Sequence, residues 1–148
     1  MKIDVKIKLC GAGKVPTYAT VGSAAVDLCA ATKEKIILPP GERVLVPTGI
    51  AISPERQDVV AVVAARSGLA IKHGISLSNG IGVIDSDYRG EICVGLINNS
   101  NKDFTIEPSD RIAQLLFMPV YTANFIKAAN LDETDRGAGG FGSTGIKG

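Results

Sequence analysis

The sequence predicts an all-β fold, either a sandwich or a barrel, on the basis of three observations. Short runs of β-branched and other apolar residues recur along the 148-residue chain, and turn-forming residues separate them at even spacing. No long segment shows the 3.6-residue period of an amphipathic helix. Regularly spaced short strands are typical of β-sandwiches and barrels, and the length suits a single domain with one core.

The expected strands follow from alternation and from the breakers between them. In the first, residues 2–9, the apolar residues Ile3, Val5, Ile7 and Leu9 share one face, and charged residues occupy most of the other. The other apolar runs that predict strands are residues 35–38, 43–46, 50–52, 58–63, 75–77, 91–97, 104–106 and 112–120. Asn79-Gly80 is a strong β-hairpin signal. Residues 67–72 are expected to form a turn or a short helix.

The last stretch of the chain differs in composition from the rest. From Asp132 onward it reads DETDRGAGGFGSTGIKG, a polar run with six glycines. Such a segment buries too little apolar surface to order by itself, so we expect a β domain over residues 1–131 and a flexible arm over residues 132–148. Glycine backbone and hydroxyl groups suit contacts with phosphate. Composition alone leaves two interpretations open, an arm that orders on a ligand and a solvated tail.

Composition excludes several functional classes. The formal net charge of +1 gives no footprint for binding a long nucleic acid or an acidic membrane surface. Three separated cysteines and one histidine, His73, give little material for a disulfide framework, a structural zinc site or a histidine-based triad. The amino-terminal residues resemble neither a signal peptide nor a membrane span. We therefore expect an intracellular, cytoplasmic protein.

Two segments carry candidate chemistry, and each also has a simpler interpretation. Arg66, Ser67 and Gly68 follow an apolar strand, and such groups at a strand end suit an anion contact, although a surface turn also explains them. Residues 82–91 place three carboxylates near Tyr88. A carboxylate in this segment suits the role of a general base. The alternative is a polar hairpin in which aspartates favour the turn.

Three further positions are ambiguous when taken singly. Asp27 lies between apolar neighbours, which a strand with alternating exposure explains without a metal ion. Gln114 lies in a long apolar strand, where an edge position that satisfies a backbone group accounts for it. Arg136, in the glycine-rich tail, offers a bidentate charged contact to phosphate.

Taken together, in their order and spacing, five segments resemble the five motifs of the trimeric dUTPase family. They are residues 25–28, 66–70, 82–91, 110–115 and 136–145, and they include the runs RSGLA, IDSDYRGE and RGAGGFGSTG. The resemblance spans nearly the whole chain. It implies a jelly-roll-like β fold and a threefold homotrimer whose active sites draw on all three chains, with each arm closing over a neighbouring site. One departure is Ala65, where the family often has proline.

The resemblance also implies an activity, the Mg²⁺-dependent hydrolysis of dUTP to dUMP and pyrophosphate. This reaction limits uracil incorporation into DNA and supplies dUMP for thymidylate synthesis. By the same resemblance, Asp85 is the base that orients the attacking water, and Tyr88 is the ring beneath the deoxyribose. Asn79 lies on a hairpin whose backbone reads the edge of the uracil.

The remaining roles carried over by the resemblance concern the phosphates, the metal and the arm. Asp27 holds waters of the Mg²⁺ shell without binding the ion directly. The residues implied to contact the triphosphate from the β domain are Arg66, Ser67, Gly68 and Gln114. In the arm, the resemblance implies that Phe141 stacks on uracil and that the γ-phosphate is held by Arg136, Ser143 and Thr144, with Gly142 among the glycines of the phosphate-binding backbone.

Three other functions compete with this one. A dCTP deaminase of related fold requires an acid/base group directed at C4 of cytosine, and its product keeps the triphosphate. A non-catalytic nucleotide-binding or regulatory trimer does not require Asp85, Asp27 and the whole arm together. A purely structural β domain binds no deoxynucleotide. Product analysis and a turnover assay separate these alternatives.

Overall fold

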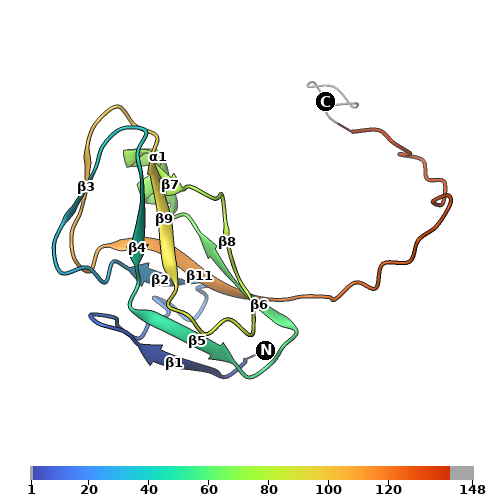
Figure 1. The fold of residues 1–148 in the computed structure, drawn as a ribbon, viewed down its shortest axis with the longest axis horizontal. Coiled ribbons are helices and arrows are strands. Elements are labelled where there is room, and N and C mark those ends of the chain that lie inside the picture. Colours follow the sequence, from blue (N-terminus) through green and yellow to red (C-terminus); the bar gives the residue numbers. More distant parts are fainter. Residues whose placement is uncertain (1, 141–148) are drawn as a thin grey trace.

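The computed structural model describes residues 2–140 and is all-β apart from one short helix (Figure 1). This confirms the predicted fold class. The elements in chain order are β1 Val5–Leu9, β2 Val26–Cys29, β3 Ile36–Leu38, β4 Arg43–Pro47, β5 Ile50–Pro54, β6 Val59–Ala64, α1 Ser67–His73, β7 Ile75–Leu77, β8 Gly82–Ile84, β9 Cys93–Asn98, β10 Phe104–Ile106 and β11 Arg111–Pro119.

The strands form four antiparallel sheets around one core. The largest sheet has the order β2-β11-β6-β8, and a three-stranded sheet has the order β4-β9-β7. Two-stranded sheets, β1-β5 and β10-β3, complete the body. Neighbours in a sheet are distant in sequence, as in a jelly roll, so most of the stabilising contacts join remote parts of the chain.

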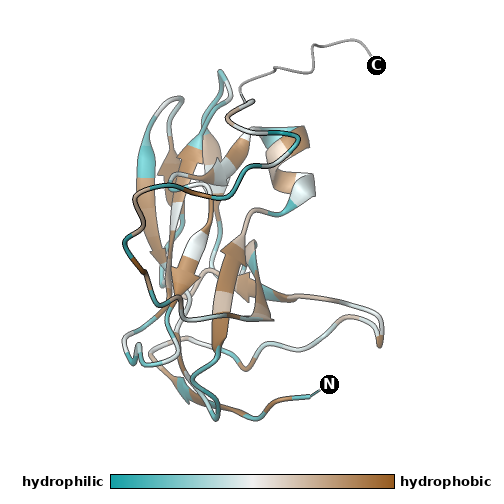
Figure 2. Ribbon diagram, turned by 90° about the vertical axis from the view of Figure 1, so that its right-hand side faces the viewer, coloured by the Kyte–Doolittle hydropathy of each residue, from teal (hydrophilic) through white to brown (hydrophobic). Residues whose placement is uncertain are grey.

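Alternation along the strands places one face of each main sheet in the core. In β6 and β9 every second residue is buried, which is the period of an extended chain with one face packed. Leu28, Val46, Leu96 and Ile106 are at most 1% exposed and belong to one apolar cluster. Each such side chain contributes roughly 1.5–3 kcal/mol relative to full exposure. Figure 2 shows hydrophobic strands joined by mainly hydrophilic loops.

The structure corrects two local predictions. Asn79-Gly80 does form a turn, and Gly80 has a φ of +76°, but the strands on either side of it do not make a hairpin. Strand β7 pairs with β9 and β8 pairs with β6, because the buried residues of β7 pack in the smaller sheet. Gln114 does not occupy an edge position, since β11 lies between β2 and β6. The sequence prediction also omitted β8, a three-residue strand that begins with glycine.

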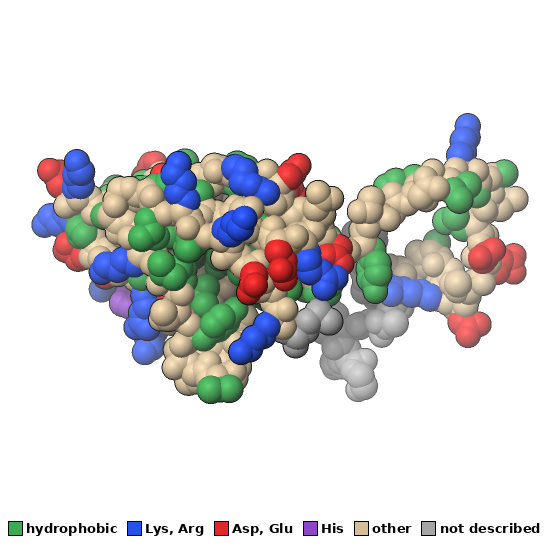
Figure 3. Space-filling view, turned by 90° about the horizontal axis from the view of Figure 1, so that it is seen from below, with side chains coloured by type: hydrophobic (Ala, Val, Ile, Leu, Met, Phe, Trp, Pro, Cys, Tyr) green, Lys and Arg blue, Asp and Glu red, His purple; other side chains and the backbone are tan. Residues whose placement is uncertain are grey.

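The chain leaves the body after β11. Residues 120–138 are exposed, and Figure 1 shows this segment as a long extended path away from the sheets. Figure 3 shows it as an arm beside the body, whose visible face carries basic and acidic groups interspersed. None of the helices in residues 2–140 has the length and hydropathy of a membrane span.

A buried asparagine fastens the end of β9 to its surroundings. Asn98 is 0% exposed, and its Nδ2 donates to the carbonyls of Leu38 and Lys102 at 2.8 and 2.7 Å. Its Oδ1 accepts hydrogen bonds from the backbone N–H and the hydroxyl of Ser100 at 2.9 and 2.7 Å. A buried amide with this many partners is costly to remove, because each partner then loses its hydrogen bond without access to water.

We expect Asn98→Ala to lower the free energy of unfolding by about 3 kcal/mol, since several buried polar groups lose their partner. Asn99→Ala, at the exposed neighbouring position, is the matched control and should cost less than about 0.5 kcal/mol. Denaturant unfolding at equal protein concentration measures both. Equal losses for the two variants would contradict the structural role of the Asn98 network.

Candidate active site

The register of the largest sheet brings three of the candidate segments together. Asp27 on β2 lies opposite Gln114 on β11, and Gln114 lies opposite Ala64 at the end of β6. These three residues lie side by side on neighbouring strands. Arg66 follows Ala64 by two positions along the chain. Segments that are about 40 to 90 residues apart therefore meet at one end of the sheet, because strand pairing fixes which residues are neighbours.

Two arginines surround the carboxylate of Asp27. Arg66 Nε lies 2.9 Å from Oδ1, and Arg111 Nη1 lies 3.3 Å from Oδ2. A bulge in the pairing of β11 with β2 falls between Arg111 and Ala113 and sets Arg111 opposite Cys29, two residues from Asp27 on the same face. The side chains of Arg66 and Asp27 are 26% and 31% exposed, so this pair is partly shielded from water.

The same cluster leaves hydrogen-bond donors available. Within residues 2–140, two of the five N–H groups of Arg66 are engaged, one by Asp27 and one by the carbonyl of Arg111 at 2.9 Å. Gln114 Nε2 donates to the carbonyl of Ala65 at 2.9 Å, which confirms the prediction that its amide satisfies a backbone group. The remaining donors of these two side chains suit an anion.

Ser67 and Gly68, the next two residues, are exposed at the start of α1. A Cβ added to Gly68 meets nothing within 4 Å among the described residues, so their packing does not require a glycine there. Without a side chain at this position, another molecule or chain has room to approach the backbone closely.

The second predicted group lies on a turn after β8. The N–H of Tyr88 donates to the carbonyl of Asp85 at 3.1 Å, so the chain reverses over these residues. Asp85 is exposed and the ring of Tyr88 is 45% exposed. Arg89 Nη1 donates to the carbonyls of Ser86 and Tyr88 at 2.8 and 3.0 Å and closes the turn from outside. A carboxylate and an aromatic ring are thus held on one hydrogen-bonded chain reversal.

The two groups lie at different levels of the sheet. Extending the β6–β8 register places Asp85 opposite Val60, whereas Gln114 lies opposite Ala64. The offset of four residues corresponds to about 13 Å along the strands, at roughly 3.3 Å per residue. Asp85 and Gln114 are also separated by the width of β6. A single chain therefore does not bring the candidate base next to the candidate anion site.

The other predicted residues lie on the turn before β8, on the arm, or outside the described residues. Asn79 is exposed on the turn between β7 and β8. Arg136 lies on the arm, where its Nε donates to the carbonyl of Gly139 at 2.9 Å. The remaining arm residues of the prediction lie outside the described range, namely Phe141, Gly142, Ser143 and Thr144.

Magnesium chemistry fits Asp27 only through water. Residues 2–140 contain no group of three or more His, Cys, Asp or Glu side chains that could hold a metal ion. Both oxygens of Asp27 face guanidinium groups, yet each keeps a further lone pair that can accept a hydrogen bond from a metal-bound water. Mg²⁺ usually keeps several waters and is bound through few carboxylates plus substrate phosphates, so this donor set fits the ion.

Arg111 belongs to this cluster, although the sequence does not predict its place there. It lies in the fourth motif segment, and its contact with Asp27 depends on a bulge that no local sequence pattern indicates. The only available signal was a cation at the start of an apolar strand, next to Asp110.

The described cysteines are free thiols. Burial, together with the charge of Glu91, raises the pKa of the Cys93 thiol. Cys93 is therefore protonated at neutral pH and is not a candidate nucleophile.

An all-β body with two guanidinium groups gathered around one carboxylate on β2 has the fold and the local charge that suit a protein binding an anion. Comparison with known proteins makes this specific. A dUTPase family model matches residues 12–145. The deoxyuridine 5'-triphosphate nucleotidohydrolase of Desulfitobacterium hafniense is 53% identical over 97% of this chain and 98% of its own length. That of Escherichia coli is 48% identical over 97% of each chain.

The chain belongs to the dUTPase family and is an enzyme of that family. Solved structures agree on the fold. The dUTPase of Staphylococcus bacteriophage 80alpha, solved with dUpNHpp, superimposes with a TM-score of 0.87 at 23% identity, covering 97% of this chain and 99% of its own. The dUTPase of phage phi11 of S. aureus, in a structure that details the coordination of a structural Mg(II) ion, has a TM-score of 0.79 at 20% identity and covers 88% of this chain.

Proposed function

We propose that this enzyme hydrolyses dUTP to dUMP and pyrophosphate by attack of water on the α-phosphorus. The observation that carries the proposal is the family match over residues 12–145, a range that contains every candidate residue from Asp27 to Thr144. The relatives named as deoxyuridine 5'-triphosphate nucleotidohydrolases cover nearly the whole chain. In the cell this reaction limits the incorporation of uracil into DNA and supplies dUMP for thymidylate synthesis.

In this mechanism Asp85 is the general base. Its carboxylate accepts a proton from water as the water oxygen bonds to the α-phosphorus, and the bond from that phosphorus to the bridging oxygen breaks. Pyrophosphate leaves with the electron pair of that bond. The exposure of Asp85 on a fixed turn supports this role, because the carboxylate is accessible and held in place. General-base action contributes roughly 10²–10⁴-fold to such a rate.

The triphosphate is held by the cluster at the end of β6. The remaining N–H groups of Arg66 and Gln114, together with the exposed Ser67 and Gly68, supply donors to phosphate oxygens. Asp27 would hold Mg²⁺ through its bound waters, and the ion would supply positive charge to offset that of the phosphates and of the leaving pyrophosphate. A protein of net charge +1 needs such local compensation for a polyanion.

Selectivity for deoxyuridine is assigned to the turn residues and the arm. The ring of Tyr88 lies beneath the deoxyribose and leaves no room for a 2′-hydroxyl. Backbone groups around Asn79 pair with the uracil edge, and cytosine, with its reversed donor and acceptor, leaves buried groups unpaired. From the arm, Phe141 stacks on uracil, while the γ-phosphate is held by Arg136, Ser143, Thr144 and the backbone at Gly142.

The proposed active unit is a homotrimer with shared sites. The offset between Asp85 and Gln114 supports this, because a base from one chain and an anion site from another can meet where one chain alone keeps them apart. The exposed arm supports it as well, because residues 120–138 lie outside their own body, where they are accessible to another chain.

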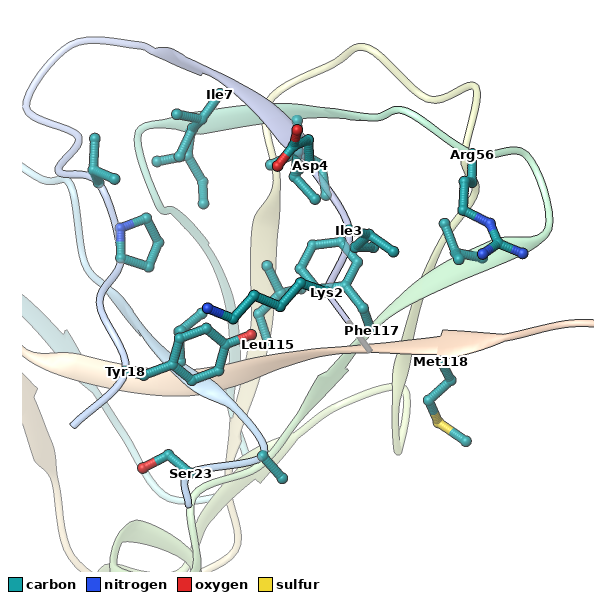
Figure 4. A pocket seen from close by; sticks show the side chains of 18 of the residues that line it. Lys2, Ile3, Asp4, Ile7, Tyr18, Ser23, Arg56, Leu115, Phe117 and Met118 are labelled. Carbon is teal, nitrogen blue, oxygen red and sulfur yellow. The ribbon is translucent and has the colours of Figure 1, made fainter. Parts of the chain in front are cut away.

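An apolar cleft beside β1 provides a surface for assembly. The cleft has a volume of about 1030 Å³, and its lining includes Ile3, Ile7, Tyr18 and Phe117 (Figure 4). The segment that follows β11 exposes large apolar side chains: Tyr121 is 101%, Phe125 94% and Ile126 82% exposed. Burying such side chains is favourable, and β1 is bonded on one edge only, to β5. We assign residues 120–131 of a neighbouring copy to this cleft.

The first test of the function is product analysis with a panel of nucleotides. With Mg²⁺ we expect dUMP and pyrophosphate from dUTP, strong preference over dCTP, dTTP and UTP, and loss of activity with a chelator. The reason is the combination of a base, a deoxyribose platform and an outer-sphere carboxylate. Orthophosphate as the first product would contradict attack at the α-phosphorus. A dCTP product that keeps its triphosphate would instead indicate a deaminase.

A second test separates two roles of Asp27. Asp27→Asn keeps the size of the side chain but removes the charge that holds both arginines. We expect weaker binding of a non-hydrolysable dUTP analogue by roughly tenfold, about 1.4 kcal/mol, even with a chelator present, because the placement of Arg66 needs no metal. Arg111→Met should weaken binding in the same direction. Calorimetric titration measures both, and a loss confined to Mg²⁺-containing buffer would assign Asp27 to the metal shell alone.

A third test addresses the shared site. One variant carries Asp85→Asn with its arm intact, and the other is a chain that ends at Asp132 with Asp85 intact and residues 120–131 retained. Each alone should be nearly inactive. When the two are co-folded in equal amounts, about a quarter of the sites should recover activity if base and arm come from different chains of a closed threefold ring. If both came from one chain, no site is complete, and mixed trimers confirmed by mass would show no recovery.

A further inference from the structure

The ring of Tyr88 rests against a residue that has no side chain. A Cβ built on Gly90 lies 2.3 Å from the phenol oxygen of Tyr88 and 2.5 Å from Cζ. Real Cβ atoms do not approach other atoms so closely, so the phenol occupies the space that any other residue at position 90 needs. The contact joins two residues of one turn, and the backbone N–H of Tyr88 donates to the carbonyl of the candidate base Asp85.

Backbone conformation does not account for this glycine. The glycines with positive φ in the described residues are Gly11, Gly41, Gly49, Gly74, Gly80 and Gly137, and Gly90 is not among them. An alanine at position 90 therefore adopts the same backbone without strain. The position of the Tyr88 ring excludes an alanine at this position. The ring, and not the backbone conformation, therefore requires the glycine.

Other contacts hold the ring and its support in place. The hydroxyl of Tyr88 donates to the carbonyl of Glu91 at 3.2 Å. The carboxylate of Glu91 accepts a hydrogen bond from the N–H of Gly49 at 2.8 Å, which ties the support to the loop between β4 and β5. Ile92, the next residue, is 1% exposed, and its N–H donates to the carbonyl of Ile50 at 2.8 Å. Residues 90–92 are thus anchored in the body, whereas the ring itself is partly exposed.

We infer that Gly90 is a positioning residue for Tyr88. The space left by the missing side chain of Gly90 sets the orientation of the Tyr88 ring, and in that orientation the ring excludes a 2′-hydroxyl. The inference rests on the proposed role of Tyr88 as the deoxyribose platform. Because the phenol is the far end of a side chain with free space beside it, a Cβ at position 90 displaces the ring and leaves the anchored backbone where it is. Gly90→Ala therefore alters the platform in a protein that still folds.

The test compares dUTP with UTP in four proteins: the wild type, Gly90→Ala, Tyr88→Ala and the double variant. We expect Gly90→Ala to lower the ratio of kcat/KM for dUTP to that for UTP by about tenfold or more, since small misplacements of positioning groups have effects of this size. In the Tyr88→Ala background the same change should have no further effect, because no ring remains to be displaced. Gly22→Ala, where a Cβ meets nothing within 4 Å and φ is not positive, is the matched control and should keep the wild-type ratio.

A second readout does not depend on activity. The chain has three tyrosines, so NMR of ring-labelled tyrosine gives few signals, and Tyr88→Ala identifies the one from Tyr88. Gly90→Ala should shift that signal and leave the other two in place. Should Gly90→Ala lower the Tm, adding Tyr88→Ala should restore it, because the clash is with the ring.

The outcomes distinguish this inference from the function on which it rests. If Tyr88→Ala relaxes the selectivity but Gly90→Ala does not, the inference is overturned and the platform role of Tyr88 stands. An effect of Gly90→Ala that persists undiminished without the ring also overturns the inference, as does a lowered Tm that Tyr88→Ala fails to restore. If Tyr88→Ala keeps the wild-type ratio, the platform role itself is wrong and the inference fails with it.

Discussion

The pairing of β11 with two strands at once is the constraint on which the candidate site depends. Because β11 lies between β2 and β6, a single register sets Asp27, Gln114 and the end of β6 in one row. A slip of one residue turns every side chain of a strand to its other face. The buried residues Ile112, Ala113 and Leu115 make such a slip costly, so the packing of the core fixes the position of the polar site.

The polar site itself contributes little to folding and much to placement. A partly exposed ion pair between Asp27 and Arg66 is worth about 1 kcal/mol at most, which is small beside the core. The ion pair orients the guanidinium group of Arg66. The carboxylate of Asp27 accepts a hydrogen bond from one of its N–H groups and the carbonyl of Arg111 accepts one from another, so the remaining donors of Arg66 are directed away from both. A near-neutral protein can then present a local cationic site to a polyanion without a large basic surface.

The turn that carries Tyr88 and the segment after β11 differ in how firmly the body holds them. Rigid elements hold the turn that carries Asp85 and Tyr88, and residues 90–92 anchor it to the body. The segment after β11 has the opposite character, with large apolar side chains exposed and its path outside the body. In the proposed trimer these two features are complementary. The body of each chain presents an ordered surface, and the segment after β11 of a neighbouring chain covers it.

The sequence by itself determined the all-β class, nearly all the strands and the family, because alternation, breakers and motif residues are local properties of the chain. After Arg66 it left a turn and a short helix both open, and the structure has the helix. It did not determine which strands pair, so the hairpin predicted at Asn79-Gly80 is wrong, as is the edge position that was one interpretation of Gln114. The tertiary structure decided the row of Asp27 and Gln114, the bulge that brings in Arg111, and the contact of Tyr88 with Gly90. Each of these depends on packing between segments remote in sequence or on the space around a side chain, and no local pattern encodes either.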